Sequence, residues 1–242
     1  NIMPLPKIST PTYELVLPSS GKKIKYRPFL VREEKILILA LESQDIKQIT
    51  NAIKATLKEC IVTRGVKVDD LPTFDIEYIF LNVRGKSVGE ALELIVTCPD
   101  DEETTVPVKV YIDEIEVKKD KKHKQEIPLD AKLTLKMKYP SLSEFIKENF
   151  EFSGETSNVQ QSFDVVASCI DMVYDQDDVW AASDCTKKEL TEWVEGLSSH
   201  QFKQIETFFE TMPKLSHTLK VKNPKTKVES EVVLEGLASF FG

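Results

Sequence analysis

The chain has 242 residues, of which 41% are hydrophobic and 30% charged, so it can bury a core as one large domain or two small ones. Its net charge of −8 argues against nucleic acid as the main partner, because binding to phosphates requires a basic surface. No apolar run approaches the roughly 20 residues that span a bilayer, and residues 1–15 lack the apolar segment of a signal peptide, so we expect a cytosolic protein without a membrane span.

The first 30 residues (1–30) predict an extended arm followed by a β-hairpin. The arm carries three prolines between Pro4 and Pro11. Alternating hydrophobicity over residues 13–17 and 23–26 flanks the turn Pro18–Gly21. The arm either docks on a partner or covers the chain's own core, and the two interpretations are equally supported.

Residues 31–86 predict a layer of three helices. The first begins near Pro28 and is apolar all round over residues 36–41, which is typical of a fully buried helix. The third runs from residue 74 to residue 84, and Gly85 is expected to end it. The second helix presents one apolar face, made of Ile46, Ile49, Ile53, Leu57 and Cys60.

Residues 87–140 predict a central β region. Residues 92–97 alternate as a strand whose second face carries Ile95, so we expect both faces to be covered. A partner strand over residues 104–117 completes a hairpin with an acidic tip. Two further strands are predicted at residues 126–130 and 132–138.

Residues 141–215 predict a helical region. Ser141–Glu144 fits a capping box that opens a short helix, and residues 163–173 repeat apolar side chains at helical spacing. Thr186–Glu189 fits a second capping box, and the apolar stripes that follow over residues 190–209 predict two more helices.

An acidic loop over residues 174–184 carries Trp180. Its carboxylates between Asp175 and Asp178 invite a calcium-binding interpretation. A calcium-binding loop needs Gly at its sixth position and Glu at its twelfth. Counted from Asp175, these positions hold Trp180 and Thr186, so no metal is expected in this loop.

Residues 216–242 predict a third hairpin and a short apolar helix. The hairpin turns at Asn223–Thr226, and the helix begins at Glu235. Phe240 and Phe241 at the end of this helix must be covered, either by the chain itself or by a partner.

The sequence shows no recognisable catalytic or cofactor-binding set. His123, His200 and His217 have no neighbouring Ser, Cys or Asp in a nucleophile or metal arrangement. The fixed-spacing motifs for phosphate and zinc are absent, and the four cysteines form no C-x-x-C pair. An enzyme is therefore the weaker hypothesis, and no cofactor is expected, although a fold can bring distant catalytic residues together.

Three stretches together resemble one protein family. These stretches are residues 26–42 (YRPFLVREEKILILALE), residues 74–90 (FDIEYIFLNVRGKSVGE) and residues 208–242, which contain FFETMPKLSHTLKV and VVLEGLASFFG. They are similar to the baseplate hub assembly family of T4-like contractile-tailed bacteriophages, whose members are described as hub assembly chaperones or hub subunits. The resemblance implies a non-enzymatic role in building the baseplate hub, with other hub proteins as partners. It places the protein in the cytoplasm of the infected host, with the virion tail baseplate as a second location.

The resemblance also implies a zinc-ribbon-like site, with one C-x-x-C in each of the two later hairpins. The corresponding residues here are Cys98, Asp101, Asn223 and Thr226. A structural zinc site needs four Cys or His ligands, and only one remains, so no zinc is expected. The family still implies that the two turns lie side by side. We expect hydrogen bonds to replace the metal, such as one between Asp101 and Asn223 or Thr226.

We therefore expect a helix-rich α+β protein with an N-terminal hairpin and two zinc-ribbon-like hairpins that lack metal ligands, folded as a single compact unit. The favoured function is a hub assembly chaperone that presents apolar and acidic surface to a hub protein. The alternatives are a structural subunit retained in the mature baseplate and, more weakly, a cytosolic enzyme of unknown reaction. The expected contact residues are Trp180, Phe240 and Phe241, together with the arm at Pro4–Pro11.

Overall fold

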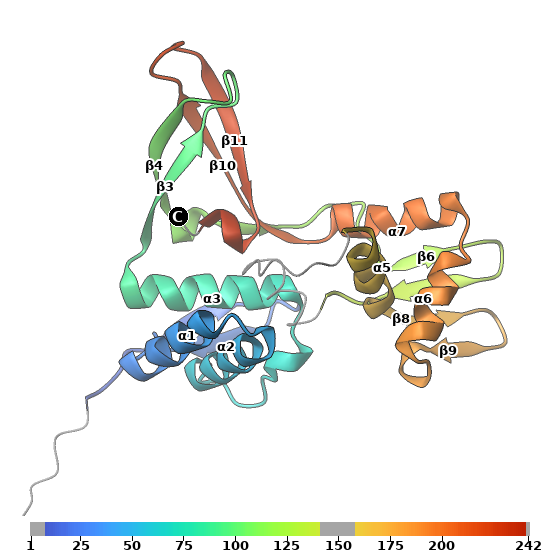
Figure 1. The fold of residues 1–242 in the computed structure, drawn as a ribbon. Coiled ribbons are helices and arrows are strands. Elements are labelled where there is room, and N and C mark those ends of the chain that lie inside the picture. Colours follow the sequence, from blue (N-terminus) through green and yellow to red (C-terminus); the bar gives the residue numbers. More distant parts are fainter. Residues whose placement is uncertain (1–7, 141–157, 241–242) are drawn as a thin grey trace, which may run out of the picture.

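The computed structural model describes residues 8–140 and 158–240. The chain forms two lobes, each built around its own cluster of buried hydrophobic side chains (Figure 1). The first lobe combines residues 13–118 with residues 214–240. The second is formed by residues 126–140 and 158–211, which lie between them in the sequence. The mixed α+β class predicted from the sequence is confirmed.

The first lobe begins with the predicted hairpin and helical layer. Leu15 and Ile24 lie opposite each other in the antiparallel hairpin and are both buried, so the alternating pattern correctly located the core face. The elements are β1 (Tyr13–Val16), β2 (Lys23–Tyr26), α1 (Val31–Ser43), α2 (Ile46–Cys60), the 3-10 helix η1 (Val68–Asp70) and α3 (Thr73–Val88).

Helix α3 lies at the centre of the first lobe and is longer than predicted. Ile76, Ile79 and Val83 have no exposed surface, as the helical spacing indicated. The prediction that Gly85 ends the helix is wrong, because the helix continues to Val88 and Gly89 follows it with φ +132°. Position 85 lies inside the helix, and a side chain there would be too close to its neighbour, because a Cβ would be only 2.4 Å from Cδ1 of Ile112. Close packing, not helix termination, therefore explains this glycine.

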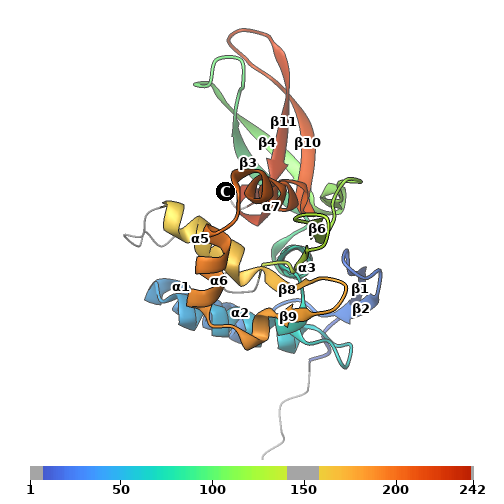
Figure 2. The same cartoon turned by 90° about the vertical axis from the view of Figure 1, so that its right-hand side faces the viewer.

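Helix α1 is not the fully buried helix that its composition predicts. Ile38 and Leu39 are 56% and 55% exposed, and Ala40 on the opposite face is buried. The helix lies on the outer side of the helical layer (Figures 1 and 2), where only one of its faces packs against the lobe. The prediction failed because an apolar helix face that meets solvent has the same composition as one that meets a core.

Two long hairpins project from the helical layer of the first lobe (Figure 1). The predicted covering of both faces of strand β3 (Ala91–Thr97) is wrong, because Ile95 on its outer face is 78% exposed. The strands are β3 (Ala91–Thr97) and β4 (Thr105–Tyr111) in one hairpin, and β10 (Lys214–Lys222) and β11 (Glu229–Glu235) in the other. The short 3-10 helix η4 (Leu237–Phe240) follows β11.

The strand predicted to run from residue 104 to residue 117 is interrupted. The 3-10 helix η2 (Ile112–Glu114) follows β4 and redirects the chain. The short strand β5 (Glu116–Lys118) then pairs with β10, with Leu215 opposite Val117. The resulting sheet has the order β11-β10-β5. It therefore joins the two sequence segments that make up the first lobe, which meet at residues about one hundred positions apart.

In the part of the second lobe that the structure describes, three α-helices pack against a four-stranded antiparallel sheet. Its strands are β6 (Glu126–Pro128), β7 (Thr134–Met137), β8 (Ile170–Tyr174) and β9 (Val179–Ala181), in that order across the sheet. Its helices are α5 (Asn158–Ser168), α6 (Lys187–Glu195) and α7 (Ser199–Thr211). The predicted capping box is present at the start of α6, where Thr186 Oγ1 accepts from the Glu189 N–H.

The predicted helix over residues 163–173 is wrong in its second half. Helix α5 ends at Ser168, and residues 170–174 form strand β8 in the middle of the sheet. Ile170 and Val173 are buried, as a helix would also have required. Their three-residue spacing fits a helix as well as a strand, so the spacing alone did not distinguish the two. The segment forms a strand because it pairs with β7. Next to this pairing, the Lys138 N–H donates to the Cys169 carbonyl oxygen at 2.7 Å.

Aromatic side chains connect the two lobes. Phe74, at the start of α3, packs edge-on against Tyr139, with ring centroids 4.9 Å apart. Tyr139 in turn stacks on Phe208 of α7, with centroids 5.8 Å apart. The single compact unit with its five sub-regions stays a prediction. The capping box at residues 141–144 lies outside the described residues.

Candidate functional site

The turns of the two long hairpins meet through a buried asparagine. Asn223 is 1% exposed, and its Nδ2 donates to Oδ2 of Asp101 at 2.9 Å. The same nitrogen lies 3.1 Å from both carboxylate oxygens of Asp100, and the Thr226 hydroxyl also donates to Asp100. The predicted contact between Asp101 and Asn223 is therefore present, and the two hairpin tips lie side by side (Figures 1 and 2).

Each turn is also fixed within its own hairpin. Asp101 accepts from the hydroxyl and the backbone N–H of Thr104, which together with Asn223 hold the pKa of this carboxyl well below its usual range. In the other turn, Oδ1 of Asn223 accepts from the N–H groups of Lys225 and Thr226, at 2.8 and 3.3 Å. Both ends of the Asn223 amide are thus in use, one within its own turn and one across to the neighbouring hairpin.

These side chains do not fit a structural zinc site. Cys98 supplies the only thiol, it is fully buried, and burial together with the neighbouring carboxylates Asp100 and Asp101 raises its pKa, which disfavours the thiolate that binds metal. Asn223 and Thr226 contribute an amide and a hydroxyl, which are already hydrogen-bonded. Within residues 8–140 and 158–240, no group of three His, Cys, Asp or Glu side chains is placed to hold a metal.

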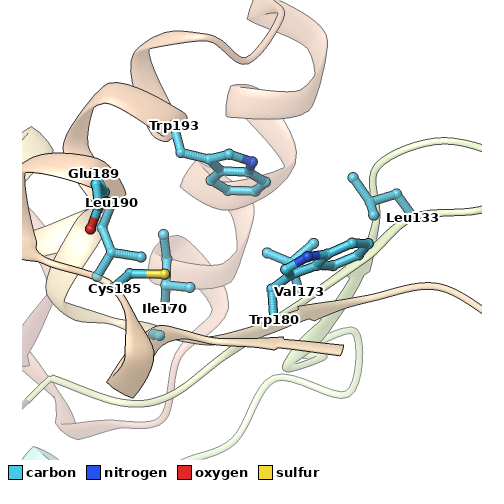
Figure 3. A pocket seen from close by; sticks show the side chains of 9 residues that line it. Leu133, Ile170, Val173, Trp180, Cys185, Glu189, Leu190 and Trp193 are labelled. Atoms are coloured by element: carbon cyan, nitrogen blue, oxygen red, sulfur yellow. The ribbon is translucent and has the colours of Figure 1, made fainter. Parts of the chain in front are cut away.

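An apolar pocket of about 420 Å³ opens in the second lobe (Figure 3). Both tryptophans of the chain line it: Trp180 from β9 and Trp193 from α6 lie on either side of the space. The remaining wall comes from the sheet, the segment before β7, the 3-10 helix η3 (Ala182–Asp184) with the following Cys185, and the start of α6. It consists of Leu133, Ile170, Val173, Ala182, Cys185, Glu189 and Leu190.

Trp180 remains accessible because of its place in the sheet. Strand β9 is an edge strand and pairs only with β8, where Trp180 lies opposite Val173. The indole is 49% exposed although it is large and mostly apolar. Trp180 was predicted as a contact residue from the sequence, whereas the spacing of Trp193 indicated only the apolar face of a helix. Only the fold shows that the two indoles share one cavity.

The polar groups at the pocket serve the local structure. The carboxylate of Glu189 accepts from the N–H and the hydroxyl of Thr186, both at 2.7 Å, which lowers its pKa. Asp175 accepts from the N–H groups of Asp177 and Asp178, at 2.9 and 2.8 Å, and so forms the β8–β9 turn. The acidic loop is therefore a β-turn between two strands and has the wrong geometry for a calcium loop.

The segment that surrounds the pocket is strongly acidic. Residues 171–195 contain eight carboxylates and two lysines, which is a net charge of −6 out of −8 for the whole chain. An apolar cavity with a half-exposed tryptophan thus lies within the region that carries most of the excess negative charge. A surface of this kind favours an apolar group that is flanked by positive charge.

The other predicted contact residues have different surroundings. Phe240 has no exposed surface and belongs to the hydrophobic cluster of the first lobe, so it packs on its own chain and offers no contact surface. Phe241 and the first half of the proline-containing arm lie outside the described residues. In the described part of the arm, Ile8 is 93% exposed.

The histidines do not form a catalytic set in the described structure. His123 is held by Tyr139 at 3.1 Å and Thr211 at 2.9 Å, and burial lowers its pKa. His217 lies 3.1 Å from the Glu114 carbonyl oxygen, far in sequence from the pocket. Among the described helices, none is both long and apolar enough to cross a membrane.

The described chain is thus a mixed α+β protein with an apolar pocket in an acidic part of its surface. It belongs to the family described as T4 bacteriophage base plate protein, whose model matches residues 10–242. No curated protein and no solved structure matches the chain. The resemblance is confirmed at the level of a T4-like phage baseplate protein, which has a structural or assembly role in the virion tail or in the infected cell.

Proposed function

We propose that this protein promotes assembly of the central hub of the baseplate by binding another hub protein through the pocket between Trp180 and Trp193. The observation that carries the proposal is this pocket, an apolar cavity of about 420 Å³ in an acidic surface of a baseplate-family protein. The apolar lining and the acidic surroundings of the pocket support the expectation that the loop with Trp180 presents apolar and acidic surface to a partner.

The pocket has the properties of an anchor site in a protein–protein interface. Tryptophans are enriched among the residues that dominate binding energy, and they act best in pockets that exclude water. The half-exposed Trp180 and the adjacent Leu190 and Val173 can enclose one large apolar side chain of a partner. The chain itself supplies no described side chain that fills this volume.

The charge distribution indicates what surrounds that anchor in the partner. With a net charge of −6 over residues 171–195, the rim attracts Lys and Arg and repels carboxylates. The partner segment is therefore basic, with an aromatic or long aliphatic residue at its centre. Such a complex forms faster at low salt, because surface charges are screened beyond about 8 Å at physiological ionic strength.

Co-purification from infected cells tests the proposal. The tagged wild-type chain and a Trp180→Ala variant are used as baits, and captured tail proteins are identified by mass spectrometry. We expect one hub protein to be captured by the wild type and lost with Trp180→Ala. Ile95→Ala is the matched control, because Ile95 is also an exposed apolar residue but lies on β3 in the other lobe. Equal capture by all three baits would contradict the proposal.

A structural subunit that stays in the finished baseplate is the second candidate, and the family description favours it equally. Mass spectrometry of purified phage particles separates the two roles. A chain that is absent from mature tails supports the assembly role. Stoichiometric presence in mature tails supports the structural subunit and leaves the pocket as its contact within the baseplate.

A further inference from the structure

The outer face of α1 is an apolar surface that no described element covers. Val31 is 80% exposed, Ile38 56% and Leu39 55%, whereas Glu33 and Ala40 on the inner face are buried. Buried Glu33 accepts from Arg27 at 2.9 Å and from Arg32 at 2.7 Å, which fixes the rotation of the helix on the lobe. The apolar side chains therefore point outward because the helix is anchored in this orientation, and local fraying does not explain their exposure.

The residues at the centre of this face form a symmetrical pattern. Lys35, Ile38, Leu39 and Glu42 occupy positions i, i+3, i+4 and i+7, which form a diamond on the helix surface. All four side chains are exposed. When two such helices meet antiparallel across a two-fold axis through the centre of the diamond, position i of one chain faces position i+7 of the other. Position i+3 then faces position i+4 of the other chain. The pattern is thus matched to an antiparallel copy of itself.

We propose that the protein forms a two-fold symmetrical dimer through antiparallel α1 helices. In this arrangement Lys35 of each chain lies opposite Glu42 of its partner, and Ile38 lies opposite Leu39. Ile36 and Leu41, which are 46% and 38% exposed, point to the two opposite sides of this face and lie outside its centre. The charges are self-complementary, as an isologous interface requires.

The charge pattern favours a second copy over another partner. No ion pair is formed by Lys35 or Glu42 within the described ranges, so both charges are available at the two ends of the apolar centre. A partner of a different sequence would need the opposite charges in the opposite order, whereas a second α1 has them by symmetry. The proposal concerns a different lobe from the tryptophan pocket and does not depend on it.

The size of the contact sets the expected strength. A single helix face buries less than the roughly 800 Å² per partner of a standard interface, so the dimer should dissociate on dilution. Sedimentation velocity of the full chain is the test. We expect the average mass to rise from one chain at about 2 µM towards two chains at about 200 µM, the range in which micromolar affinities are resolved.

Variants of the exposed residues identify the interface without disturbing the core. Ile38→Glu places a carboxylate at the centre of the apolar contact and should abolish the dimer at every concentration. Ile95→Glu, a substitution of another exposed isoleucine, is the control and should dimerise like the wild type. Circular dichroism confirms that both variants keep the fold.

A charge exchange tests the register. Lys35→Glu places like charges opposite Glu42 twice in the dimer and should weaken it about five-fold or more, since such pairs repel when desolvated. Lys35→Glu combined with Glu42→Lys should restore the wild-type affinity. A wild-type chain that stays monomeric throughout, a dimer unaffected by Ile38→Glu, or a double variant without restoration would each overturn the proposal.

Discussion

Asn223 and Asp101 are 122 positions apart in the sequence, yet the amide of one donates to the carboxylate of the other at 2.9 Å. This hydrogen bond joins the tips of two hairpins that belong to different sheets, β3–β4 and β11-β10-β5. The contact connects the two turns through a neutral amide, a hydroxyl and two carboxylates. One buried amide and its neighbours thus hold two loops together that are distant in the sequence.

The turn contact should contribute measurably to stability. Asn223→Ala removes the donor to Asp100 and Asp101 and leaves the Lys225 and Thr226 N–H groups without their acceptor. We expect a loss of about 1–3 kcal/mol in the free energy of unfolding, measured by denaturant titration. Lys225→Ala, at an exposed position of the same turn, is the control and should change the stability by less than about 0.5 kcal/mol.

Zinc should have no effect on this protein. The side chains of Cys98, Asp101, Asn223 and Thr226 include one buried thiol with a raised pKa and no second thiol or imidazole, whereas a structural zinc site needs four such ligands. Metal analysis of purified protein should give far less than one zinc per chain, and a chelator should leave the melting temperature unchanged. One zinc per chain, with a fall in melting temperature on chelation, would show that ligands are supplied in another way.

Glu33 should make stability dependent on pH in the acid range. Burial alone would raise its pKa, but hydrogen bonds from Arg27, Arg32 and the Leu30 N–H lower it from 4.5 to about 2. Because the folded pKa is the lower one, this contribution is fully present above pH 4.5 and is lost as the pH falls towards 2. Glu33→Gln should cost about 3 kcal/mol at neutral pH, since it leaves the guanidinium of Arg27 without its partner in a largely buried site.

The control for this experiment is Glu34→Gln, a substitution of the neighbouring residue for which no ion pair is recorded within the described ranges. Denaturant titrations at several pH values between about 2.5 and 7 provide the measurement. The slope of stability against pH should be smaller in Glu33→Gln than in Glu34→Gln or the wild type. Identical slopes in all three proteins would show that other carboxylates cause the acid sensitivity.

Gly85 should be coupled to Ile112. In an unconstrained helix, replacement of Gly by Ala gains about 1 kcal/mol, but the new Cβ would lie 2.4 Å from Cδ1 of Ile112. We expect Gly85→Ala to lose this gain or to destabilise the protein, as extra methyl groups in a packed core do. Ile112→Val removes the clashing methyl group. The double variant should therefore be at least about 1 kcal/mol more stable than additivity of the single variants predicts, which a double-mutant cycle measures.

Local patterns in the sequence predicted several elements correctly. The β1–β2 hairpin follows from alternation around Pro18–Gly21, and the start of α6 follows from the Thr186–Glu189 capping box. Both signals depend on residues that are neighbours in the chain. They therefore carry enough information to determine structure without knowledge of the surrounding fold.

Other features depend on packing partners that are distant in sequence. Glycine is typical of a helix end, and only the position of Ile112 shows why a glycine occurs at position 85 inside the helix. Ile170 and Val173 fit a helix as well as a strand, and pairing with β7 selects the strand. The pocket was only half predicted, because the apolar spacing of Trp193 is the same whether its helix covers a core or lines a cavity.

The pairing of β5 with β10 has a consequence for synthesis of the protein on the ribosome. Lys118 pairs with Lys214, and Leu215 and Phe240 are fully buried in the first lobe, so this lobe lacks part of its core until residues 214–240 have been translated. All described members of the second hydrophobic cluster lie between residues 126 and 211, so this segment can fold while the nascent chain is still attached. Translation of the first lobe therefore begins before that of the second lobe, but its core is completed after that of the second lobe. Until residues 214–240 have been translated, the first lobe exposes apolar surface to the cell.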